Sequence, residues 1–160
     1  MRLFRIPILL IIGTWFLLSS CDEKIDPEVE ARQNREAIVN EAPIAIDYQI
    51  NTPSEKLSED IKAFSGHWVG RWRDRFPSQL IVTEINSNKA TFIYSWGDNP
   101  SHNITAGAIQ ETIELDDQGR IVFQKDSAQI TFTVNTILNK VIGVKIKDDE
   151  VSNIVMERMR

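Results

Sequence analysis

From residue 66 to the end of the chain, short runs of alternating hydrophobic and polar residues are separated by turn residues. Alternation with period two is the pattern of a β-strand with one buried face, because successive side chains point to opposite sides of the strand. The pattern predicts eight strands, over residues 67–75, 79–86, 90–96, 102–115, 120–124, 128–134, 140–147 and 151–159.

The connections between these predicted strands are short, and short connections favour antiparallel neighbours. An open sheet of eight strands would leave two unpaired edges, and closure into a barrel removes them. We therefore predict an all-β domain over residues 57–160, an eight-stranded antiparallel up-and-down barrel. The interior of such a barrel is either filled by side chains or holds one small ligand.

Alternation also predicts which side chains face inward. In the first strand Trp68 and Trp72 share one side, while Arg71 and Arg73 share the other. Burial favours the tryptophans inside and the arginines in water. If the first and last strands pair antiparallel to close the barrel, residues near position 68 lie opposite residues near position 158. This places Arg158 beside Trp68, where a cation–π contact can form.

The stretch Gly66-His67-Trp68, with a helical turn predicted just before it, resembles the Gly-x-Trp motif of the lipocalins and related calycin barrels. In that family the tryptophan closes one end of the barrel and is covered by a basic residue of the last strand. The resemblance implies a lipocalin-like fold with Gly66, Trp68 and Arg158 as closure residues. The long C-terminal helix of many lipocalins has no counterpart in this sequence.

The pattern of the N-terminal residues indicates a targeting segment. Arg2 and Arg5 flank the start of an apolar run over residues 6–18, which is shorter than the roughly 20 residues that span a bilayer. Leu18-Ser19-Ser20-Cys21 resembles the lipobox of bacterial lipoproteins, in which the segment before the cysteine is removed and the thiol is lipidated. We therefore expect a signal peptide over 1–20 and a membrane anchor of fatty acyl chains, such as palmitate, on Cys21. The alternative is an ordinary signal peptide or an uncleaved anchor.

The resemblance to lipoproteins implies a place in the bacterial cell envelope, on the periplasmic face of the inner membrane or in the outer membrane and cell surface. Residues 21–56 are polar and acidic, and we expect a tether that holds the domain off the bilayer. Asp26-Pro27-Glu28 is a helix-start pattern and predicts a helix over 27–40. The stretch 44–50 is either part of a spacer or an extended segment laid on the barrel.

Composition narrows the function classes. Hydrophobic residues make up 42% of the 160-residue chain and charged residues 26%, as in globular proteins. The net charge of -5 argues against a nucleic-acid partner, because phosphate binding needs a dense basic face. A single cysteine excludes an intrachain disulfide and a Cys-rich zinc site, and two histidines leave little material for a metal site. We expect no cofactor.

Ligand-binding candidates gather at the end of the barrel opposite Trp68. We expect Trp72, Tyr94 and Trp96 to line that mouth, with Asp98 and His102 at its rim. An aromatic cup with a few polar groups suits a small apolar or amphipathic ligand, although the same aromatic residues would also fill the barrel. A filled barrel would favour the alternative function, an envelope protein-interaction module that acts as an inhibitor or assembly partner.

Catalysis has little support, because His102 and Asp98 lack a nucleophile that the sequence can place.

Overall fold

The computed structural model describes residues 26–73 and 75–159. The signal peptide predicted over 1–20 and the lipidation site predicted at Cys21 lie outside these residues. The chain forms, in order, α1 (Pro27–Glu41), α2 (Glu59–Phe64), β1 (Gly66–Trp72), β2 (Pro77–Ile85), β3 (Lys89–Trp96), the 3-10 turn η1 (Pro100–His102), β4 (Gly107–Glu114), β5 (Ile121–Lys125), β6 (Ala128–Asn135), β7 (Lys140–Lys147) and β8 (Glu150–Arg158).

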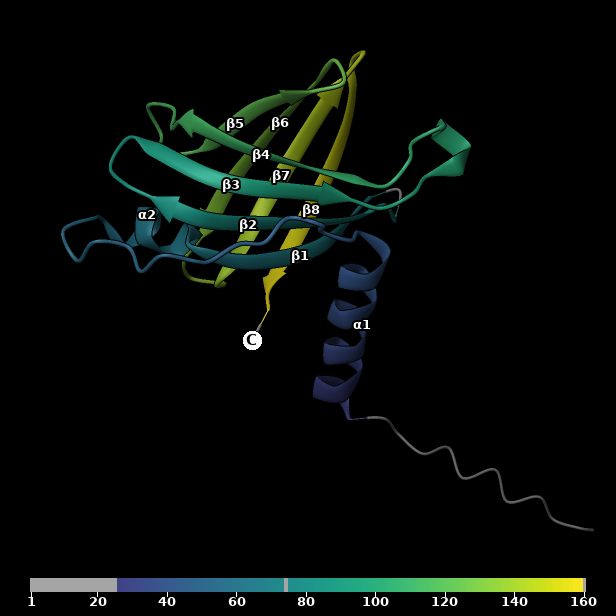
Figure 1. Cartoon of the computed structure of the whole chain (residues 1–160), viewed down its shortest axis with the longest axis horizontal. Helices are drawn as coiled ribbons and strands as arrows, with labels where there is room; N and C mark the ends of the chain where they lie inside the picture. Colours follow the sequence, from purple (N-terminus) through teal and green to yellow (C-terminus); the bar gives the residue numbers. More distant parts are fainter. Residues whose placement is uncertain (1–25, 74, 160) are drawn as a thin grey trace, which may run out of the picture.

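The eight strands form one antiparallel sheet in the order β4-β3-β2-β1-β8-β7-β6-β5. Every strand pairs with the next one in sequence, except that β4 does not pair with β5. In addition, the first strand, β1, pairs with the last, β8. The sheet curls into a nearly closed barrel with its remaining opening between β4 and β5 (Figure 1). The predicted all-β fold with eight antiparallel strands is confirmed.

One end of the barrel is closed around Trp68, which is fully buried. Trp68 pairs with Arg158 across β1 and β8, and the guanidinium carbon of Arg158 lies 4.1 Å from the centre of the indole ring. The same guanidinium donates to the backbone oxygens of Ser65, at 2.6 Å, and Ala63, at 2.9 Å. Burial removes water from this cation and thereby lowers the pKa of Arg158, while the two backbone oxygens and the indole ring replace part of the lost hydration.

The barrel interior is filled with aromatic side chains. Phe123 and Phe132 contact each other with ring centres 6.2 Å apart, and Phe123 also lies 5.0 Å from Phe92. Trp72 meets Phe132 at 6.3 Å. Tilted and edge-on contacts at these distances stabilise aromatic cores beyond the burial of their area. The sequence left a filled interior and an empty cup both open, and the observed packing is that of a filled interior.

Among the predicted strands, the first and the fourth differ most from the bounds that the structure shows. The first ends at Trp72 instead of residue 75, because Arg75 adopts a φ of 63°, outside the extended region. The fourth begins at Gly107 instead of residue 102. The residues before it form the η1 turn, which ends at Asn103 with a left-handed φ of 53°. His102 therefore lies in a loop at the rim and not in a strand.

The segment before the barrel is packed against it. The Asp26 side chain caps α1 by accepting from the backbone N–H of Glu28 at 2.9 Å, as the sequence pattern indicates. Ile38 near the end of α1 is 3% exposed, and Ala42 just beyond it is fully buried. Ala42 accepts a hydrogen bond from the Ser95 hydroxyl at 2.9 Å. Residues 38–42 thus rest on the outer wall instead of serving only as a spacer.

His67 links this outer segment to the barrel wall. Its Nε2 lies 2.6 Å from Gln79 Oε1, and Gln79 in turn donates to the backbone oxygen of Ala42. Burial lowers the pKa of His67 below its ordinary value of 6.5, against the opposing effect of the Gln79 hydrogen bond. The folded state therefore favours the neutral ring. The stability that it contributes is present above pH 6.5 and is lost as the pH falls through the folded-state pKa.

Acidification from about pH 7.5 to about pH 5.5 is expected to lower the free energy of unfolding through His67. The His67→Gln variant should lose less stability over this range than the wild-type chain. Urea unfolding at a series of pH values measures this slope. His102→Gln is the matched control, since His102 is exposed, and it should keep the wild-type slope. Equal slopes in all three proteins would contradict the assignment.

Candidate ligand site at the open end of the barrel

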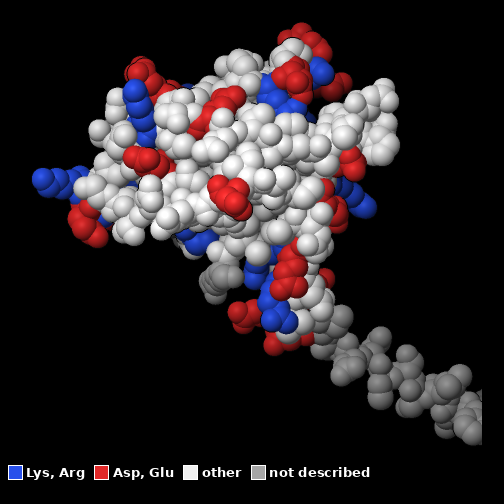
Figure 2. Space-filling model, in the orientation of Figure 1, with Lys and Arg blue, Asp and Glu red and all other residues white. Residues whose placement is uncertain are grey.

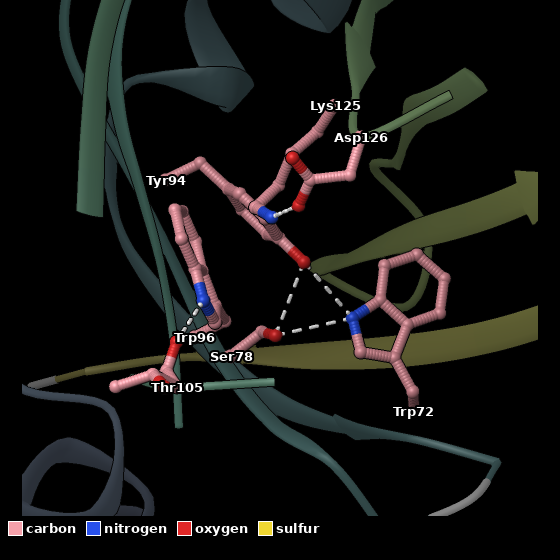
Figure 3. A network of polar contacts seen from close by, with 7 residues as sticks. All are labelled: Trp72, Ser78, Tyr94, Trp96, Thr105, Lys125 and Asp126. Atoms are coloured by element: carbon pink, nitrogen blue, oxygen red, sulfur yellow. Dashed lines mark hydrogen bonds and ion pairs between the residues drawn. The ribbon is translucent and has the colours of Figure 1, made fainter. Parts of the chain in front are cut away.

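Trp72 and Tyr94, two of the residues predicted to bind a ligand, are buried and hydrogen-bonded to each other. The Trp72 indole N–H lies 3.1 Å from the Tyr94 hydroxyl and 3.1 Å from the Ser78 hydroxyl. The two hydroxyls are 3.2 Å apart and complete a triangle (Figure 3). Trp72 is 1% exposed and Tyr94 2%, so both residues form the floor beneath the mouth.

Trp96 lies above this floor and is half-buried. Its ring centre is 5.9 Å from that of Tyr94, and its indole N–H donates to the backbone oxygen of Thr105 at 2.8 Å. The ammonium of Lys125 sits 3.9 Å from the centre of the Trp96 ring and is ion-paired with Asp126 (Figure 3). Trp96 is therefore held in place by a cation–π contact at the edge of β5.

Asp98 and His102, which were predicted at the rim of the mouth, make their hydrogen bonds within the loop between β3 and β4. Asp98 Oδ1 accepts from the backbone N–H of Ala106 at 2.7 Å. His102 is exposed, and its Nδ1 lies 3.2 Å from Asn99 Oδ1 and 3.1 Å from the Ser101 hydroxyl. Within residues 26–73 and 75–159, no hydrogen bond or ion pair joins Asp98 to His102. The structure therefore does not bring His102 and Asp98 together as a base and its orienting carboxylate.

An apolar recess opens beside Tyr94 at the mouth. Its volume is about 80 Å³, and it lies between the ends of β3, β5, β6 and β7. Its walls are mostly apolar and its edge carries charge; the lining residues are Phe76, Tyr94, Ile104, Lys125, Asp126, Ala128, Ile130, Lys145 and Lys147.

A larger surface groove of about 410 Å³ adjoins this recess. The two share Ile104, Asp126, Lys145 and Lys147, so the groove leads into the recess. Its remaining lining comes from Arg73 of the β1–β2 turn, from His102, and from the start of β8. The combined site is a shallow, partly apolar depression over a filled barrel. A deep cup is not present there.

Lys145 connects the depression to the aromatic floor. Its ammonium lies 5.2 Å from the centre of the Trp72 ring and 5.7 Å from that of Phe76. In the part of the chain that the structure describes, no carboxylate lies within ion-pair distance of Lys145. Directly across from it in β8 is Ser152, whose buried hydroxyl has no hydrogen-bond partner among the described residues. This wall therefore carries a cation at its surface, with a buried hydroxyl on the neighbouring strand.

Lys145 and Lys147 were not predicted as site residues. A signal was present, because both lie in phase with the buried residues Val141 and Gly143 of the same strand. The lysines continue the inward-facing side of β7 to the open end, where a long side chain carries its charge to water.

The described residues contain no cluster of three or more His, Cys, Asp or Glu side chains that could hold a metal ion. None of the helices among them has the length and apolar character needed to cross a membrane. The sequence matches no protein-family model and no curated protein.

Proposed function

We propose that this protein is a lipid-anchored lipoprotein of the bacterial envelope that binds a small amphipathic molecule with an anionic group at the open end of its barrel. Cys21, through its lipobox-like context, would carry the anchor. The observation that carries the ligand proposal is the apolar recess bordered by Lys125, Lys145 and Lys147. Lys145 in particular places an ammonium group over the aromatic floor, 5.2 Å from the centre of the Trp72 ring.

The volumes of the recess and of the adjoining groove limit the size of the ligand. Sites for drug-sized molecules usually enclose about 300–1,000 Å³. The recess of about 80 Å³ takes only a short apolar or aromatic group. The adjoining groove of about 410 Å³ takes the rest of the molecule, where its anionic group meets Lys145 and its neighbours. Long acyl chains buried along the barrel axis do not fit, because Phe123 and Phe132 occupy that space.

Replacing Lys145 with Gln tests this proposal. The lipidated protein in nanodiscs is titrated with anilinonaphthalene sulfonate, an anionic aromatic probe, and energy transfer from the tryptophans reports the bound fraction. We expect Lys145→Gln to weaken binding by about tenfold or more, because a hydrogen bond to a charged group contributes about 1.5–3 kcal/mol.

Lys89→Gln provides the matched control. Lys89 is exposed at the start of β3, at the closed end of the barrel, and its replacement removes the same charge. This variant should bind the probe as the wild-type protein does. Equal affinity of both variants, or no energy transfer to the probe in the wild-type protein, would reject the ligand site.

The filled interior and an exposed apolar surface favour a second candidate, an envelope protein-interaction module. On the outer wall of β7 and β8, Ile146 is 44% exposed and pairs with Val151, which is 54% exposed, and Val155 farther along β8 is 54% exposed. Phe76 and Pro77, at the start of β2, are buried and do not contribute to this surface.

A photo-crosslinking residue at Val155 would test this second function in cells. It should capture one envelope protein reproducibly, whereas the same residue at the exposed Gln110 of β4, on another part of the barrel wall, should not. Identical patterns at the two positions would count against an interaction surface on β7 and β8.

A further inference from the structure

The turn between β6 and β7 exposes two large apolar side chains at its tip. Ile137 is 93% exposed and Leu138 is 60% exposed, the highest values among the large hydrophobic residues that the structure describes. The other turns at this end of the barrel carry polar residues, at 87–88 and 116–119. Turns normally carry polar residues, so an exposed Ile-Leu pair at a turn calls for an explanation.

The geometry of the turn does not require these side chains. The backbone N–H of Leu138 donates to Asn135 Oδ1 at 2.9 Å, and the N–H of Asn139 reaches the backbone oxygen of Thr136 at 3.4 Å. Thr136 also donates to Asp60 of α2 at 3.2 Å, which fixes the base of the turn. Polar residues thus build the turn, and the two apolar side chains at its tip contribute little to the fold.

The tip lies on the side of the molecule where the lipid anchor would enter. Leu138 lines the same surface recess as Glu28, which is in the first turn of α1. Figure 1 shows the start of α1 and the C-terminal end of the chain on one side of the barrel, away from the η1 loop of the open end. Cys21 precedes Asp26 by five residues, a stretch that reaches at most about 18 Å when fully extended.

Electrostatic attraction does not favour contact between this side of the protein and a lipid surface. Glu157 is paired with Lys140 at 3.0 Å and with Arg35 at 3.3 Å, so the recess beside the tip is largely neutralised. Figure 2 shows acidic and basic side chains interspersed along α1. A lipid surface would therefore be met by the apolar tip and not by a basic patch. Apolar residues of this kind enter the boundary between headgroups and acyl chains, about 5–10 Å deep.

We propose that Ile137 and Leu138 insert into the lipid surface to which Cys21 is anchored. This inference rests on the lipid anchor of the proposed function. The anchor and the tip form two attachment points, and a protein held at two points has a defined orientation. The open end, with Lys145 at its mouth, then faces away from the bilayer.

The test uses the full-length lipidated protein carrying Leu138→Cys. Acylation blocks the thiol of Cys21, the only native cysteine, so the new thiol alone takes a fluorescent label. The protein is placed in vesicles of phosphatidylethanolamine with a minority of phosphatidylglycerol, with and without nitroxide-labelled lipid. We expect severalfold stronger quenching of this label than of one at Asp149→Cys, in the β7–β8 turn of the open end. Adding Ile137→Asp to Leu138→Cys should bring the quenching down to the control level.

Two readouts separate the possible failures. The mass of the N-terminal peptide shows whether Cys21 is acylated, and flotation shows whether the protein is on the vesicles. An acylated, floating protein whose label at position 138 is quenched no more than that at position 149 would overturn the docking inference and leave the anchor intact. An unacylated Cys21 would overturn both proposals. A label shielded from water but insensitive to nitroxide lipid would indicate contact with a second copy of this chain and would also overturn the inference.

Discussion

Replacement of Trp68 with Ala is expected to lower the free energy of unfolding by about 3–5 kcal/mol, a large part of the 5–15 kcal/mol typical of a domain. Trp68 is fully buried at the closed end, so its removal leaves a cavity that neighbouring strands cannot collapse to fill. The change also removes the indole N–H that donates to the backbone oxygen of Phe64 at 2.8 Å. Arg158 then loses the ring that it covers at 4.1 Å.

Urea unfolding followed by far-UV circular dichroism measures this loss. Trp68→Phe should fall between the wild type and the alanine variant, because it restores part of the volume but not the hydrogen bond to Phe64. Val155→Ala, on the exposed side of β8, should change stability by less than about 0.5 kcal/mol. Similar stabilities for Trp68→Ala and Val155→Ala would show that the closed end does not hold the barrel together.

The barrel could be predicted because hydrophobic and polar residues alternate along most of its strands. The seventh strand was predicted over 140–147 and is observed over Lys140–Lys147. Assuming closure of the barrel was enough to place Arg158 opposite Trp68, which is the pairing observed. The opening between β4 and β5 gave no comparable signal. The hydrogen-bonded order simply ends at these two strands, and β5 is only five residues long.

The position of α1 on the barrel could not be predicted, because the groups that receive it look like solvent-facing polar residues. Gln79 is 1% exposed and Ser95 is fully buried, and both donate to the backbone oxygen of Ala42. In the sequence, Gln79 follows the polar Ser78, and Ser95 lies between Tyr94 and Trp96, so both look like exposed positions of a strand. Their burial depends on a hydrogen bond to a distant segment, which periodicity does not encode.

The candidate site was predicted only in part for a related reason. Trp72 and Tyr94 were correctly placed on the inner side, but their polar atoms bind each other and Ser78. The mouth above them is formed largely by lysines. A charged residue in a strand is ordinarily assigned to solvent, and only its place near the end of an inward-facing row brings Lys145 over Trp72. Strand ends are where hydrophobic patterning carries the least information.

Replacement of Gly66 with Ala is expected to destabilise the protein by about 2–4 kcal/mol, although it adds a single methyl group. Gly66 has a φ of 136°, a conformation that residues with a side chain rarely adopt. A Cβ atom there would lie 2.1 Å from Arg158 Nη1. Arg158 would have to move, and its hydrogen bonds to Ser65 and Ala63 would weaken with it.

Gly119→Ala separates backbone strain from the collision with Arg158. Gly119 also has a positive φ, of 71°, but the nearest atom to its added Cβ would be Ile61 Cγ1 at 3.8 Å, an ordinary contact. This control should cost about 1–2 kcal/mol, the usual penalty for a left-handed residue. Urea unfolding of both variants gives the comparison. If Gly66→Ala costs no more than Gly119→Ala, Arg158 adjusts freely, and the glycine serves the turn before β1 instead of the approach of the closing guanidinium.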